Sequence, residues 1–168
     1  MMLSDRTYRA LIESGDVRVI PEPADSQYQP VSLDLRLGTS FAQLPRNQFG
    51  SSHQFNETEM LVQPGEFLLA ATEERILLPS YVAAVVHGKS TWARRGLMVE
   101  AAGLIDPGFE GTITLELKNL SDLPVRLCAG YPIAQMSFHL TDVSVLRPYG
   151  SPGLSSHYQG QQNAEPAR

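Results

Sequence analysis

The chain has 168 residues, of which 42% are apolar, enough for one globular domain with a sizeable core. A net charge of −5 argues against a nucleic-acid coat, and no apolar run reaches the roughly 18 residues of a membrane span. The single cysteine excludes an internal disulfide framework. Asp5 and Arg6 stand where a signal peptide needs apolar residues, so we expect a cytoplasmic protein with no membrane partner.

The first segment predicts one amphipathic helix over residues 5–14. Ser4 is a suitable N-cap residue for it. Tyr8, Leu11 and Ile12 would share the buried face of this helix because they recur at helical spacing. The rest of the chain offers little further helical pattern.

Most of the remaining chain predicts short strands separated by glycine and proline. In residues 32–38 (SLDLRLG), leucines alternate with polar residues, as in a strand with one buried face. Similar strand patterns occur in residues 67–79, 81–88, 111–119 and 123–138. The 13 glycines and 12 prolines are spread at short intervals, which is typical of an all-β sandwich or barrel.

The composition changes near residue 150. We expect residues 1–149 to form a single β domain, because no linker interrupts them. Residues 150–168 are poor in apolar side chains and rich in Gly, Ser and Gln. This composition favours a flexible C-terminal tail.

The letters GKST at residues 88–91 end a P-loop motif, but the rest of that motif is missing. A P-loop requires a glycine where Ala83 stands, and it requires α/β alternation, so we reject an ATP-binding P-loop. Lys89, Arg94 and Arg95 nevertheless bring three cations beside two hydroxyls, a set that suits several phosphate oxygens. From this stretch alone, a solvated basic patch explains the residues equally well.

Three further polar residues carry little information one by one. Asp106 lies in the turn IDPG, where a carboxylate often caps the turn. Glu116 lies on the polar face of a strand, which is usually a solvent-facing position, and Gln135 lies in PIAQ. Their order along the chain is more informative than each residue alone.

The segments QPVSLDLRLG, GKSTWARRGL, AAGLIDPGFEGTITLELKN, YPIAQMSF and RPYG…HYQGQ, in this order, resemble the deoxycytidine triphosphate (dCTP) deaminases. That family belongs to the superfamily of the trimeric deoxyuridine triphosphatases (dUTPases). The resemblance runs over residues 2–162. It implies a mainly β, dUTPase-like distorted barrel or β-clip, with a short N-terminal helix and a flexible tail that closes over the nucleotide.

The resemblance implies hydrolysis of dCTP to dUTP and ammonia, which supplies dUTP and dUMP for thymidylate synthesis. Two alternatives stay open: a bifunctional enzyme that forms dUMP and pyrophosphate, and a nucleotide sensor without catalysis. Zinc-dependent deaminases carry H-x-E and C-x-x-C, whereas this chain has one cysteine and none of its four histidines begins an H-x-E motif. We therefore expect no zinc and no protein metal site, with Mg²⁺ carried by the triphosphate.

The resemblance also assigns catalytic roles. Glu116 would be the general base and acid. Ser90 would orient the attacking water or the amine, and Arg94 would pair with the glutamate or the substrate. The backbone carbonyl near Ala102 would help to hold the water.

The substrate-binding residues implied by the resemblance contact different parts of the nucleotide. Asp106 would bind the 3′-hydroxyl of the sugar, and Thr114 would line the base pocket. Gln135, Tyr149 and Gln161 would complete the triphosphate site. The full set comprises Lys89, Ser90, Thr91, Trp92, Ala93, Arg94, Asp106, Thr114, Leu115, Glu116, Gln135, Tyr149, His157 and Gln161.

Two positions depart from the family pattern. Ala101 stands where threonine is usual, which puts feedback inhibition by deoxythymidine triphosphate (dTTP) in doubt. His157 stands where lysine is usual, which would make a phosphate contact there pH-dependent. The resemblance further implies a homotrimer whose sites are shared between subunits, with dCTP or dUTP as ligand and no nucleic-acid partner.

Overall fold

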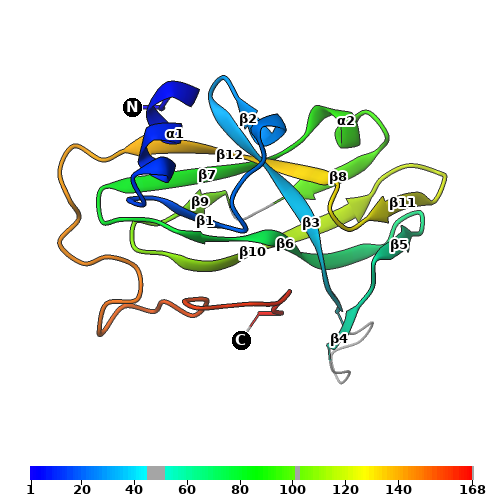
Figure 1. Ribbon diagram of the computed structural model, residues 1–168. Helices are drawn as coiled ribbons and strands as arrows, with labels where there is room; N and C mark the ends of the chain where they lie inside the picture. Colours follow the sequence, from blue (N-terminus) through cyan, green and yellow to red (C-terminus); the bar gives the residue numbers. More distant parts are fainter. Residues whose placement is uncertain (45–51, 101–102, 168) are drawn as a thin grey trace.

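The computed structural model describes residues 1–44, 52–100 and 103–167 (Figure 1). Within these residues, no helix is long and apolar enough to cross a membrane. The helical segments are α1 (Asp5–Glu13), a 3-10 turn η1 (Asp25–Gln27) and α2 (Ser90–Ala93). The strands are β1 (Arg18–Ile20), β2 (Tyr28–Gln29), β3 (Ser32–Gln43), β4 (His53–Asn56), β5 (Glu59–Val62), β6 (Phe67–Leu77), β7 (Val82–Gly88), β8 (Leu97–Glu100), β9 (Leu104–Ile105), β10 (Glu110–Asn119), β11 (Val125–Cys128) and β12 (Pro132–Leu140).

The helix α1 forms where the sequence predicts it. Tyr8 is fully buried, and its hydroxyl oxygen lies 2.7 Å from the backbone carbonyl oxygens of Gln29 and Ser32. Its ring also stacks on Phe138 of β12, with the ring centroids 5.2 Å apart. Ser4 occupies the N-cap position, although its side chain makes no capping hydrogen bond. One aromatic side chain therefore fixes the helix to the β domain.

Antiparallel strands form most of the domain, which confirms the predicted fold class. The main sheet has the order β8-β10-β6-β3-β12-β7-β9, and β1, β2 and β4 extend it at its margins. A separate two-stranded ribbon pairs β11 with β5. The sheet curls so that β12 and β7 lie across the core from β6 and β10 (Figure 1).

The strand β10 shows the alternation that the sequence predicts. Leu115 and Leu117 are fully buried in the core, while Thr114 and Glu116 are half-buried on the opposite face. Because side chains alternate along a strand, every second residue of β10 lies on the face opposite the core. The face that carries Glu116 is the one that the C-terminal segment covers.

The strand β3 carries leucines on one face and polar residues on the other, as the sequence predicts. Most of its residues are buried on both faces, and its edges pair with β6 and β12. Asp34 is 5% exposed and pairs with Lys89, with Oδ2 and Nζ 2.5 Å apart. Arg36 donates from Nε at 2.7 Å to Glu74, which is fully buried. Ion pairs therefore hold Asp34 and Arg36 in this strand, although the Oδ1 atom of Asp34 is buried without a hydrogen-bond partner among the described residues.

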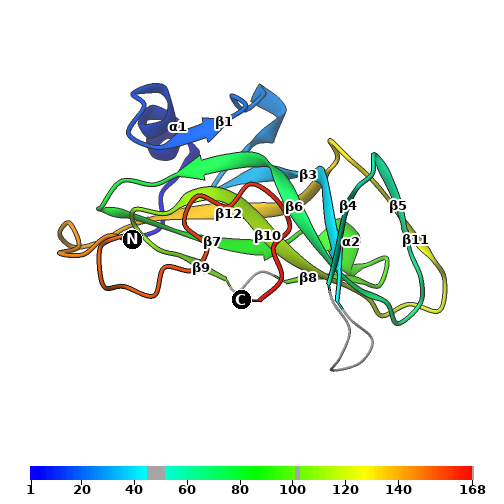
Figure 2. The same cartoon turned by 90° about the horizontal axis from the view of Figure 1, so that it is seen from below.

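The C-terminal segment lies against the outer face of β10 and β6 (Figures 1 and 2). The amide of Gly160 donates to the Glu110 carbonyl at 2.7 Å, and the Gln161 carbonyl accepts from Thr112 at 3.0 Å. Ala164 is fully buried in a small apolar cluster on this face. Composition alone does not reveal these contacts; flexibility of the segment in the free protein stays a prediction.

Candidate active site

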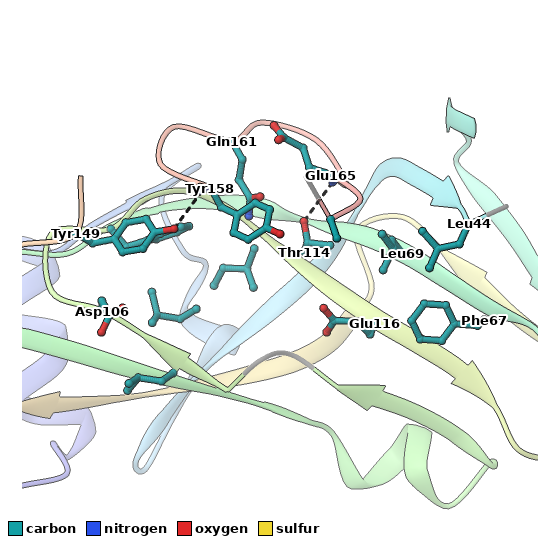
Figure 3. Close-up of a pocket in the computed structure, with 15 residues that line it drawn as sticks. Leu44, Phe67, Leu69, Asp106, Thr114, Glu116, Tyr149, Tyr158, Gln161 and Glu165 are labelled. Atoms are coloured by element: carbon teal, nitrogen blue, oxygen red, sulfur yellow. Dashed lines mark hydrogen bonds between the residues drawn. The ribbon is translucent and has the colours of Figure 1, made fainter. Parts of the chain in front are cut away.

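A cavity of about 410 Å³ lies between β10, the turn that follows β9 and the C-terminal segment (Figure 3). Its wall is largely apolar, with Leu44, Phe67, Leu69, Leu104 and Phe109 among the contributing side chains. Polar groups enter this apolar wall at a few points only. The cavity brings together five of the predicted substrate-binding residues, namely Asp106, Thr114, Glu116, Tyr149 and Gln161.

Glu116 points into this cavity from β10 (Figure 3). Its Oε2 atom is buried and has no hydrogen-bond partner within the described parts of the chain. Burial raises the pKa of the Glu116 carboxyl, and the Glu100 carboxylate raises it further, whereas a hydrogen bond from its own backbone amide lowers it. A carboxyl with a raised pKa can accept and return a proton more readily near neutral pH.

Gln161 enters the cavity from the C-terminal segment, beside Thr114. Its Nε2 donates to the Thr112 carbonyl at 2.6 Å, while its buried Oε1 has no partner among the described residues. In this orientation Gln161 offers an acceptor to a ligand. That acceptor suits an N–H or O–H group. The predicted contact with phosphate oxygens would use the second N–H of the amide, because the Thr112 carbonyl accepts only one of the two.

The turn with Asp106 and the start of the C-terminal segment meet at one end of the cavity. The Tyr149 amide donates to the Pro107 carbonyl at 2.8 Å, and the Tyr149 hydroxyl accepts from the Tyr158 amide at 3.1 Å. Gly108 has a φ of +90°, and a Cβ there would lie 3.0 Å from the Tyr149 nitrogen. Glycine in the IDPG turn therefore permits Tyr149 to join the turn to the tail.

The predicted phosphate loop lies elsewhere. None of residues 89–94 lines the cavity, and α2 lies away from the C-terminal segment, on the other side of the sheet layer that β6 and β10 form (Figure 1). Ser90, Thr91, Ala93 and Arg94 are exposed there. Within one copy of the chain, Glu116 therefore lies apart from the residues that are predicted to act beside it.

Besides Lys89, which pairs with Asp34, two further residues of this segment are held by structural contacts. The buried Trp92 donates its indole N–H to the Pro132 carbonyl at 2.8 Å, which fixes α2 to the start of β12. A Cβ on Gly88 would lie 2.7 Å from the Val99 carbonyl oxygen. The glycine of GKST is therefore required by packing between β7 and β8, whatever the loop binds.

The remaining predicted site residues also lie outside the cavity. Gln135 is half-buried on β12, opposite Asp34 of β3. His157 is exposed, with its ring centroid 6.3 Å from that of Tyr158. Leu115 points into the core, so only its backbone can contact a ligand in the cavity. Ala101 and Ala102 lie outside the described residues.

Metal ligands do not cluster in the described ranges 1–44, 52–100 and 103–167. No group of three or more His, Cys, Asp or Glu side chains there could hold a metal ion. The absence of zinc stays a prediction, which rests on the missing H-x-E and C-x-x-C motifs.

Sequence reasoning missed the apolar wall and the neighbour of the catalytic candidate. Phe67 and Leu69 share the face of Glu116 only because β6 pairs with β10 in one particular register. Glu100 lies opposite Glu116 for the same reason, through the pairing of β8 with β10. The alternation within each strand was available as a signal, but the register between strands was not.

The curled antiparallel sheet and the C-terminal segment over its outer face define a dUTPase-like β protein. The chain belongs to the dCTP deaminase-like family, whose sequence model matches residues 2–141. This confirms the resemblance found in the sequence. The chain is 40% identical over 182 residues to the "dCTP deaminase, dUMP-forming" of Bifidobacterium longum (strain DJO10A), which covers all of this chain and 94% of that relative.

Two solved structures show the same fold. The 2′-deoxycytidine 5′-triphosphate deaminase from Agrobacterium tumefaciens has a TM-score of 0.71 at 22% identity, over 83% of this chain and 48% of that chain. A mutant dUTPase of Staphylococcus bacteriophage 80alpha has a TM-score of 0.55 at 15% identity, over 78% of this chain and 94% of that chain. At these identities the likeness extends to the fold alone.

Proposed function

We propose that the protein converts dCTP to dUMP, with release of ammonia and pyrophosphate. The observation that carries the proposal is the Glu116 carboxyl, which has a buried, unpartnered oxygen in a largely apolar cavity. The name of the Bifidobacterium relative, 40% identical over almost its full length, supports dUMP as the product. This is the bifunctional alternative of the sequence analysis rather than its leading product, dUTP.

The deamination step needs one group that moves protons. Glu116 accepts a proton from a water molecule while the water oxygen forms a bond to C4 of cytosine, and N3 takes up this proton as the C4=N3 double bond becomes single. Glu116 then moves the remaining hydroxyl proton to the amino nitrogen. As the C4–N bond breaks, ammonia leaves and the C4 carbonyl of uracil forms. The apolar side chains around Glu116 keep bulk water away from this exchange.

The substrate would lie along the cavity with its base near Glu116. Thr114, two residues away on the same face of β10, would line the base site, and the unpartnered Oε1 of Gln161 would accept from a donor on the base or sugar. Asp106 at the other end would accept from the 3′-hydroxyl. The phosphates would then extend beyond the cavity, where a single copy of the chain does not supply the predicted phosphate-binding groups.

Those missing groups support a site shared between copies of the chain. Lys89, Ser90 and Arg94 carry the cations and hydroxyl that the triphosphate and the attacking water need, but they lie outside the cavity. We propose that a second copy supplies them, in a homotrimer. Mg²⁺ would arrive bound to the triphosphate as part of the substrate, and no zinc would take part.

The test is incubation with dCTP and Mg²⁺, with dUTP, dUMP, pyrophosphate and ammonia resolved over time. We expect dUMP, pyrophosphate and ammonia in equal amounts, without accumulation of dUTP. Accumulation of dUTP without pyrophosphate would favour the leading product of the sequence analysis instead. If dCTP bound but was not converted, a nucleotide sensor without catalysis would be the remaining alternative.

A further inference from the structure

Glu100 is the last residue of β8 and lies directly opposite Glu116 in the antiparallel pairing of β8 with β10. Side chains at directly opposed positions project to the same face, with Cβ atoms about 4.5–5.5 Å apart. The burial pattern agrees, since Val99 of β8 and Leu117 of β10 are both buried on the other face. The two carboxylates therefore share one surface of the sheet.

We propose that Glu100 is a positioning residue for the deamination, whose carboxylate strengthens the hold of Glu116 on the proton taken from the attacking water. The inference rests on the proposed function, because it takes Glu116 as the base. The protons leave the water oxygen, reside on Glu116 and go first to N3 and then to the departing nitrogen. Glu100 neither gives nor receives them and acts only through its negative charge.

The physical basis is repulsion between like charges. When Glu116 is ionised, two carboxylates face each other across one strand pair, which favours the state in which one of them is protonated. Burial acts on Glu116, which is half-buried, and not on Glu100, which is exposed. Burial and the Glu100 carboxylate both raise the pKa of Glu116.

Within one copy of the chain, other charged groups surround Glu116 less directly, and Arg94 of a second copy is proposed to act beside the attacking water. From β6 the opposed residue is Leu69, which carries no charge. Lys118 follows two residues later on the same face of β10, and its ammonium donates to the Gly65 carbonyl at the end of the sheet. The titratable groups on the cavity wall itself are Asp106, Tyr149, Tyr158 and Glu165. Within the described chain, Glu100 is the acidic residue directly opposite Glu116.

The decisive experiment titrates Glu116 itself, by NMR of protein labelled with ¹³C at glutamate carboxyls. The signal of Glu116 is identified by its loss in Glu116→Gln. In Glu100→Gln we expect the pKa of Glu116 to fall at low salt, and to fall by less as added salt screens the exposed charge. Glu100→Lys should lower it further, because the charge is reversed.

The matched control is Glu59→Gln, which removes a carboxylate that pairs with Arg126 on the β11–β5 ribbon. It should leave the titration of Glu116 unchanged. An unchanged Glu116 pKa in both Glu100→Gln and Glu100→Lys, with intact folded spectra, would overturn the proposal.

A second readout links the charge to the reaction. The acid limb of kcat/KM for dCTP should move to lower pH in Glu100→Gln by the same amount as the NMR pKa, because the base then stays ionised at lower pH. A purely structural role would lower activity at all pH values without moving the limb, and would count against the proposal. If the protein does not deaminate dCTP at all, the NMR titration still reports on the carboxylate pair.

Discussion

Glu116 shows at the scale of one residue what could be predicted and what could not. The period of two in GTITLELKN places it on the polar face of a strand, and the structure confirms that face. The sequence cannot tell that the face is covered by the C-terminal segment and lined by Leu69. A residue that resembles an ordinary solvent-facing glutamate is therefore half-buried, with a raised pKa.

This raised pKa predicts that Glu116→Gln stabilises the protein at neutral pH. The folded state binds the Glu116 proton more tightly than the unfolded state, whose pKa lies near 4.5, so stability falls as pH rises from the unfolded to the folded pKa. Glutamine does not ionise, so the variant does not lose this stability as the pH rises. The Tm of the variant should exceed that of the natural protein at pH 7.5, and the difference should vanish near pH 4. A variant that is less stable at both pH values would contradict the burial argument.

Ser90→Ala and Arg94→Ala should lower kcat by at least about 10²-fold, since both residues are proposed to act beside the attacking water. Both are exposed in one copy of the chain, so the Tm of the unliganded protein should change little, by an equivalent of roughly 0.5 kcal/mol or less. Steady-state kinetics with dCTP separates two roles. If a substitution raises KM and leaves kcat intact, the substituted residue acts in phosphate binding rather than in the chemical step.

At the scale of elements, local patterns predicted strands and the helix, and tertiary contacts decided the rest. Helical spacing gave α1, and alternation gave the faces of β10. The alternation in β3 does not reveal that Asp34 is buried, because its ion pair with Lys89 joins segments far apart in the sequence. The C-terminal segment appeared unattached because its hydrogen bonds join residues far apart in the sequence, such as Gln161 with Thr112 and Ala164 with Ser40, which leave no mark in composition.

Removal of residues 151–168 should cost most of the catalytic efficiency and little stability. The segment covers the cavity with Tyr158 and Gln161, so its loss opens the site to water. Its apolar contribution is small, centred on Ala164, and should amount to about 1 kcal/mol or less of unfolding free energy. kcat/KM and the Tm of the truncated protein, with and without dCTP, test both statements. A truncated enzyme with full efficiency would show that the segment plays no part in the site.

At the scale of the whole molecule, the resemblance predicted the fold class and the family, and the structure and family match confirm both. It also implied sites shared between subunits, and a single chain shows two separated groups: the cavity with Glu116 and the loop with Ser90 and Arg94. No pattern along the sequence reveals which residues meet across copies of a chain.

A shared site predicts that two inactive variants restore activity in one oligomer. The Glu116→Gln subunit still supplies Arg94, and the Arg94→Ala subunit still supplies Glu116. A mixed trimer therefore contains some sites in which both residues are intact. Unfolding and refolding equal amounts together should restore about a quarter of the natural activity, if subunits mix at random. Refolding each variant alone is the control. No recovery, with mixed oligomers verified by mass, would place all catalytic groups within one chain.

The central claim is that Glu116 moves the protons of deamination, and ammonia release by Glu116→Gln tests it most directly. The measurement compares the rate of ammonia release from saturating dCTP and Mg²⁺ with the Kd for dCTP from calorimetry, for the natural protein and the variant. Glutamine keeps the shape of the side chain but cannot accept the proton, so release should fall at least about 10²-fold while dCTP still binds. Ammonia release at a near-natural rate from Glu116→Gln would contradict the account, because another group would then be the base.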